Sequence, residues 1–430
     1  MVTSSPTEAA IFRKTVLENG LRVVSSEMPH TRSVSIGVYV GVGSRYESGE
    51  RAGVSHFLEH MLFKGTSRMP TAREISEAIE GTGGALNAGT EHELTTYWCR
   101  VARPHFRQSL ELLLDLLRNS LFEPESIEKE RMVIVEELNM INDYPGAKVD
   151  AFIDEMLWPE HPLGRDIGGT KESITSMSRD DLLDHLETHY TASNVVVSVA
   201  GNVEHAEVVD LVSSLSDGWL AGSPQSWVPA GPVQSEPQVR LQTRRTEQAH
   251  LAIAVPGVSL VDPDRYALDL MSVILGEGMS SRLFVEVREN RALAYDIQSG
   301  VSHFLDSGAF VITAGVDPKR VYEAVQIVLE QTAGMRDSLS DEELAKAKRF
   351  AGGRMLLRME NTQAVVAWMG NQELLYGGIL EVDQVVDAVE EVTTHDVMRV
   401  AGDLLVSERL NMAVVGPSRS RSRLAASLTL

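Results

Sequence analysis

Two histidines and a glutamate in one five-residue stretch have the types and spacing that a catalytic zinc ion requires. His56, Glu59 and His60 fall within about 100° of arc on one helical face, because an α-helix has about 3.6 residues per turn. Two neutral imidazoles can ligate zinc, and the carboxylate can act as general base for the water that the metal activates. The order His-x-x-Glu-His inverts the more common His-Glu-x-x-His. The stretch predicts a hydrolytic site with one Zn²⁺ per chain.

A third ligand is expected on a second helix, over residues 128–141. Its residues at spacings of four, three and four form one stripe: Glu130, Ile134, Glu137 and Ile141. Carboxylates on such a stripe are costly to bury unless a metal or a histidine compensates them. We predict Glu137 as the third ligand and Glu130 as the hydrogen-bond partner of a ligand histidine. Glu136 is the rival ligand, but its polar helical neighbours suggest that it faces water. The alternative is that the whole acidic helix is a solvated face.

Another pair of histidines, His185 and His189, is also spaced by four residues. Glu187 lies about 200° round the helix from His185, and no acidic stripe accompanies the pair. We therefore interpret this segment as a surface helix without a metal.

Charge and composition exclude several classes of protein. The net charge of −22 argues against nucleic-acid binding; it favours either solubility or an acidic chamber that attracts basic peptides. Cys99 is the only cysteine, which excludes an intrachain disulfide and indicates a reducing compartment. Met1 to Glu8 resemble no signal peptide, and no apolar run approaches the roughly 20 residues that span a bilayer. We expect a bacterial cytoplasmic protein without a membrane span.

A faint internal repeat divides the chain into two halves. The alternating strand and turn of residues 34–44 recur at residues 249–259, 215 positions later, and residues 195–200 are echoed near residue 412 at the same offset. Residues 217–237 are rich in Pro, Gly and Ser, as linkers are. At the offset of the zinc motif stand only apolar residues and one serine, Met271 to Leu275.

The repeat predicts an α+β fold with two homologous domains. We expect a zinc-binding catalytic domain at residues 1–216, the linker at 217–237, and a domain without metal at 238–430. Each should hold a mixed, mainly antiparallel sheet with helices on one face. Asn19-Gly20 between two apolar segments predicts a β-hairpin.

These motifs together resemble the pitrilysin/insulinase family of zinc metallopeptidases, most closely its mitochondrial-processing-peptidase-like bacterial branch. This is the inverzincin pattern: His56, Glu59 and His60 match the motif, Glu137 lies where the family has its third ligand, and Glu130 matches a supporting glutamate seven residues earlier. The resemblance covers residues 12–416, with Ala292 as a departure where glycine is common. It implies half of a clam-shell built from two such domains.

The resemblance also implies how substrate is held. It places the substrate-binding edge strand at Leu86, Asn87, Ala88, Gly89 and Thr90, and it implies that Arg288 and Tyr295 contact the substrate and the reaction centre. The expected activity is endopeptidase cleavage of extended, unfolded peptides or small proteins, with Glu59 as general base. A non-catalytic partner subunit of a processing-peptidase-like assembly is the alternative function. We expect a homodimer; a heterodimer with an inactive homologue is the alternative assembly.

Overall fold

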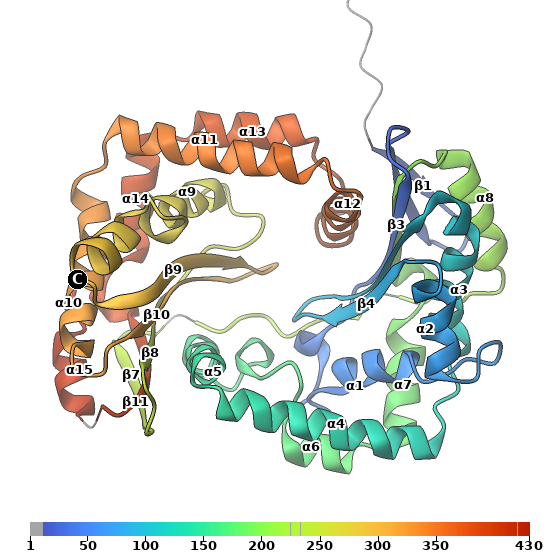
Figure 1. Cartoon of the computed structure of the whole chain (residues 1–430), viewed down its shortest axis with the longest axis horizontal. Coiled ribbons are helices and arrows are strands. Elements are labelled where there is room, and N and C mark those ends of the chain that lie inside the picture. Colours follow the sequence, from blue (N-terminus) through green and yellow to red (C-terminus); the bar gives the residue numbers. More distant parts are fainter. Residues whose placement is uncertain (1–11, 224, 233, 419) are drawn as a thin grey trace, which may run out of the picture. The chain divides into compact units, whose positions relative to one another are not determined.

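The computed structural model of the chain describes residues 12–430, apart from residues 224, 233 and 419. The expectation of no signal peptide concerns Met1 to Glu8 and lies outside the described residues. The described chain forms two compact units, each built around one mixed sheet (Figure 1). No helix among the described residues has both the length and the apolar content needed to cross a bilayer.

Unit 1 holds a six-stranded sheet of order β1-β2-β6-β3-β5-β4. All neighbouring strands are antiparallel except β2 and β6. The strands are β1 (Arg13–Val16), β2 (Arg22–Glu27), β3 (Ser33–Val40), β4 (Ala85–Thr90), β5 (Thr95–Ala102) and β6 (Val195–Gly201). The Asn19-Gly20 hairpin is confirmed: β1 pairs with β2, and Gly20 takes a φ of 86°, which favours glycine.

Unit 2 repeats this topology with one strand fewer. Its sheet has the order β7-β11-β8-β10-β9, and only β7 and β11 are parallel. The strands are β7 (Gln238–Thr243), β8 (Ala249–Pro256), β9 (Ala294–His303), β10 (Gly308–Val316) and β11 (Asn411–Gly416). The α+β class with two similar, mainly antiparallel sheets is therefore confirmed.

Helices supply the remaining layers of both units (Figure 1). In the first half of the chain they are α1 (Val54–Leu62), α2 (Ala72–Glu80), α3 (Phe106–Asn119), α4 (Pro124–Asp143), α5 (Pro145–Leu157), α6 (Lys171–Ser176), α7 (Arg179–His189) and α8 (His205–Leu215). In the second half they are α9 (Arg265–Gly276), α10 (Val321–Asp337), α11 (Asp341–Arg358), α12 (Thr362–Tyr376), α13 (Val382–Glu391), α14 (Thr394–Leu404) and α15 (Arg421–Ser427). A π-helix spans Phe284–Asn290.

The compact units are not the continuous halves expected from the repeat. Unit 1 contains Met1–Val133, Glu172–Ser226 and Leu356–Val382, whereas unit 2 contains Ile134–Lys171, Trp227–Met355 and Asp383–Leu430. The first half thus lends α5 to unit 2, and the second half lends α12 to unit 1. The expected ranges 1–216 and 238–430 describe the two sheets but not their helical cover.

The lent helices add cover to each sheet beyond the helices of its own half. In unit 1, every residue of β6 is buried, which requires cover on both faces of that strand. Helices α3 and α8 contact strands of this sheet, and α12 packs on β3 and β6. Tyr39 and Val196 lie in one apolar cluster with Val365 and Met369 of α12. In unit 2, α5 packs in the same way on β8 and β11.

A candidate metal centre on helices α1 and α4

Helix α1 presents the zinc motif as its spacing predicts. Phe57 and Leu58 are buried in the core, whereas His56, Glu59 and His60 are only half-buried. The apolar residues of the motif thus anchor the helix, and its three polar residues remain accessible.

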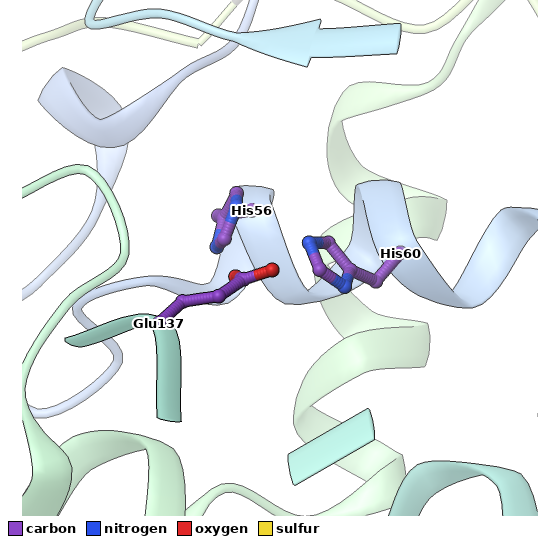
Figure 2. A group of neighbouring side chains, drawn as sticks. All are labelled: His56, His60 and Glu137. Atoms are coloured by element: carbon purple, nitrogen blue, oxygen red, sulfur yellow. The ribbon is translucent and has the colours of Figure 1, made fainter. Parts of the chain in front are cut away.

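Helix α4 brings a carboxylate to the two imidazoles. One ligand atom from each of His56, His60 and Glu137 can be chosen so that all three lie within 4.8 Å of one another. Figure 2 shows the two rings on α1 and the Glu137 carboxylate turned toward the same space. Among the residues that the structure describes, no other group of three or more His, Cys, Asp or Glu side chains meets this criterion.

Glu130 lies two turns before Glu137 on α4 and contacts the metal-site helix directly. Its Oε2 is 3.1 Å from Nδ1 of His60, and its Oε1 is 2.6 Å from Nζ of Lys64. Burial alone would raise the pKa of Glu130, but the hydrogen bonds from His60 and Lys64 outweigh it and lower that pKa. With Glu130 ionised, Nδ1 of His60 carries the proton and Nε2 keeps its lone pair for a metal.

The electrostatics of His56 also suit a ligand. Burial, and then the neighbouring His60, lower the pKa of His56 to about 4. The ring is therefore neutral at physiological pH, which is the form that ligates metals. Two imidazole nitrogens and one carboxylate oxygen make up a donor set that proteins use for catalytic zinc, so the residues present fit this ion.

Glu59 lies beside the edge of the sheet of unit 1. Its Oε2 accepts a hydrogen bond of 2.6 Å from the hydroxyl of Thr90, the last residue of β4. Among the strands that the structure describes, β4 pairs only with β5 and is the terminal strand of its sheet. The candidate base and the candidate substrate strand are therefore in contact.

Arg288 and Tyr295 lie together in unit 2. The guanidinium carbon of Arg288 is 5.3 Å from the ring centroid of Tyr295, and both residues line a cavity of about 520 Å³. Tyr295 is 76 % exposed, so it is not a core residue. Ala292, between them, has a φ of 48°, a left-handed conformation that favours glycine.

Two sequence interpretations meet different outcomes. Glu136 is exposed, as expected for a residue that faces water. The surface-helix interpretation of His185 and His189 is wrong, because both residues are buried and α7 packs on α1. His185 Nε2 lies 3.1 Å from the Ser55 hydroxyl. Burial lowers the pKa values of His185 and His189 to about 3 and about 4.

Lys64 was missed by sequence reasoning. It holds the far oxygen of Glu130, one turn after His60 in the chain. Its spacing of four from His60 was the available signal, but it became meaningful only once Glu130 was placed beside both residues.

Comparisons with known proteins cover nearly the whole chain. The family model described as "Insulinase (Peptidase family M16)" matches residues 22–171, and "Peptidase M16 inactive domain" matches residues 176–350. An uncharacterized zinc protease of Mycobacterium leprae is 37% identical over 97% of this chain and 94% of its own length. An uncharacterized zinc protease of Bacillus subtilis is 34% identical over 95% of this chain and 99% of its own length.

Solved structures show the same fold. A protease from Helicobacter pylori superimposes with a TM-score of 0.87 at 22% identity, covering 94% of this chain and 99% of that one. A peptidase M16 inactive domain from Pseudomonas fluorescens gives 0.88 at 19% identity, covering 96% and 99%. The family matches and the curated relatives together show that the chain belongs to the insulinase family, peptidase family M16.

Proposed function

We propose that the chain is a zinc-dependent endopeptidase that hydrolyses extended, unfolded peptides or small proteins. The observation that carries the proposal is the convergence of His56, His60 and Glu137 within 4.8 Å, with Glu59 on the same helix. The relatives' name, zinc protease, supports the same chemistry. The alternative, a partner subunit without catalysis, needs no such donor set.

The proposed ligands of one Zn²⁺ are His56, His60 and Glu137, and Glu130 holds His60 in its ligating tautomer. Zinc, when bound, would supply a Lewis acid and lower the pKa of a water molecule. Glu59 would take the proton from the attacking water and pass it to the leaving amine. The hydrogen bond from Thr90 holds the Glu59 carboxylate at the strand edge, where a peptide would lie.

The proposed peptide adds to β4 as a further strand. Leu86 to Thr90 form a sheet edge, and the space in front of Gly89 is open, since a Cβ added there would meet no atom within 4 Å. Main-chain hydrogen bonds would carry most of this recognition, so side-chain specificity would be loose.

Arg288 and Tyr295 would contact the substrate from unit 2. Their shared cavity and the exposure of Tyr295 support a role in binding rather than in packing. We further propose a homodimer in the bacterial cytoplasm. The resemblance to longer family members supports the dimer, and the single cysteine together with the bacterial relatives supports the compartment.

Glu59→Gln tests the mechanism. We expect the variant to bind one zinc per chain and to lose turnover by roughly 10²-fold or more, because it has no general base. Zinc is measured by elemental analysis, and turnover with a quenched fluorescent peptide, with and without chelator. Glu136→Gln is the matched control, since it makes the same chemical change on an exposed residue and should cleave normally.

Two results would contradict the proposal. Normal cleavage by Glu59→Gln would remove Glu59 from the mechanism. Metal-free, inactive wild-type protein that binds a second polypeptide would favour the partner-subunit alternative.

A further inference from the structure

Helix α1 begins without a side-chain cap from its own first residues. Its N-cap is Gly53, which has a φ of 88° and makes no side-chain cap hydrogen bond. The first amides of a helix have no partner within the helix and need acceptors from elsewhere. Glu47 supplies them: its Oε2 accepts from the Gly53 N–H at 2.7 Å, and its Oε1 accepts from the Ser55 N–H at 2.8 Å.

This arrangement is a built clamp rather than a surface contact. Glu47 is only 6% exposed, so its negative charge is held away from water. An anion at a helix N-terminus is favoured by the helix dipole, and charge-assisted hydrogen bonds are stronger than neutral ones. Two oxygens on two amides of one turn restrict both the position and the rotation of α1.

The loop that carries Glu47 is joined on its other side to the hairpin between β4 and β5. Arg45 Nη1 lies 2.5 Å from Glu93 Oε1, and both side chains are buried. The loop backbone also meets the hairpin closely, because a Cβ added at Gly43 would lie only 2.1 Å from the carbonyl oxygen of Glu91. The turn of this hairpin follows directly after Thr90, whose hydroxyl donates a hydrogen bond to Glu59, the candidate base.

We propose that Glu47 is a positioning residue that sets the direction of the metal-site helix relative to the edge strand β4. Ser55, one of the two clamped residues, immediately precedes His56, and Glu59 follows one turn later. Loosening the clamp would let the two histidines and Glu59 shift together against Thr90. The clamp lies wholly within unit 1; its consequence for zinc rests on the proposed function.

Amide hydrogen exchange on metal-free protein tests the clamp itself. In Glu47→Gln the side chain keeps its size but has one oxygen, so one of the two amides must lose its acceptor. We expect the Gly53 or Ser55 amide to exchange about tenfold to a hundredfold faster, as for loss of a hydrogen bond to a charged group. Thr393→Ala is the control: it removes the N-cap of α14 in unit 2 and should leave both amides unchanged.

Zinc affinity and kinetics test the positioning role. We expect Glu47→Gln to bind Zn²⁺ about 10 to 100 times more weakly in competition with a chelator, as when a residue that orients a metal ligand is changed. At saturating zinc, kcat should fall while KM stays within about twofold, because the loss concerns alignment rather than substrate binding. Thr393→Ala should show wild-type affinity and wild-type kcat.

The outcomes separate the ideas. Wild-type exchange at both amides overturns the clamp, and faster exchange with wild-type zinc affinity overturns its positioning role. Equal weakening of zinc binding by Thr393→Ala also overturns that role, since it would reduce the effect to general instability. If Glu47→Gln fails to fold, Glu47→Asp tests the proposal in its place. The same changes in amide exchange, zinc affinity and kcat are expected, but they should be smaller. A wild-type chain that binds no zinc refutes the proposed function, while amide exchange still decides the clamp.

Discussion

Glu130 contacts two groups at once, the ring of His60 and the ammonium of Lys64. This carboxylate can therefore orient a candidate metal ligand without itself ligating the metal. His60 occupies one oxygen and Lys64 the other. The lysine helps to keep the carboxylate ionised, and the ionised carboxylate selects the tautomer of His60. Because Glu130 and Glu137 lie two turns apart on one continuous helix, α4 itself determines their spacing.

Arg288 gives a prediction at the residue scale. Arg288→Ala should lower kcat/KM by on the order of 10²–10³ without lowering zinc content, if the guanidinium contacts the transition state. A surface ion pair with Glu289, at 3.7 Å, would contribute at most about 1 kcal/mol of stability. Peptide cleavage and zinc content are measured together.

Arg291→Ala is the matched control for this prediction. Arg291 pairs with Glu286 at 2.7 Å near the same π-helix and should be dispensable for cleavage. Near-normal turnover of Arg288→Ala with intact metal would mean that the second half of the chain is only a scaffold.

At the scale of elements, α5 carries an acidic cluster against the sheet of unit 2. Asp150 and Asp154 line a cavity of about 330 Å³ together with residues of β9 and β10. Burial, followed by the charges of Asp150, Asp166 and Glu155, raises the pKa of Asp154 from 3.8 to about 7. Between these two values the folded chain binds more protons than the unfolded chain, so the free energy of unfolding decreases as the pH rises.

Asp154→Asn should remove the loss of stability that ionisation of the buried carboxyl causes. The gain in the free energy of unfolding should be about 1.4 kcal/mol larger near pH 8 than near pH 6, which corresponds to the one pH unit between pH 6 and the raised pKa. Urea denaturation at the two pH values measures the difference. Asp210→Asn, at an exposed position, is the control. It should change the free energy of unfolding by the same amount near pH 6 and near pH 8. A gain for Asp154→Asn that is independent of pH would contradict the assignment.

At the scale of the whole molecule, the assembly state is the testable property. We expect size-exclusion chromatography with light scattering to give twice the 47.2 kDa chain mass, and peptidase activity to follow that peak. The reason is the proposal that this chain corresponds to one half of a larger assembly, which the resemblance to longer family members implies. Activity that follows a peak of monomer mass would contradict the dimer, and activity only after addition of a second polypeptide would favour the heterodimer.

Periodicity and spacing in the sequence were sufficient for much of this architecture. The 215-residue offset predicted two similar sheets, and β3 and β8 each lie third from the edge of their sheet, counted from β4 and from β9. Local helical geometry placed His56, Glu59 and His60 on one face, and the stripe on α4 placed Glu130 and Glu137 on another. These predictions succeed because they depend on contacts within one helix or between neighbouring strands.

Only the tertiary structure decided which element covers which. The apolar residues of α5 and α12 predict burial but not a partner, and each helix packs on the sheet of the other half. His185 and His189 are buried for the same reason, since distant residues enclose their helix face: Ser55 of α1 meets His185, and Tyr46 meets His189. The role of Glu47 also depends on a loop folding back onto a helix start. The sequence by itself determined which residues could ligate a metal and which helix faces were apolar. Packing between distant segments decided which element each face contacts. Such contacts leave no periodic signal along the chain, so the sequence could not predict them.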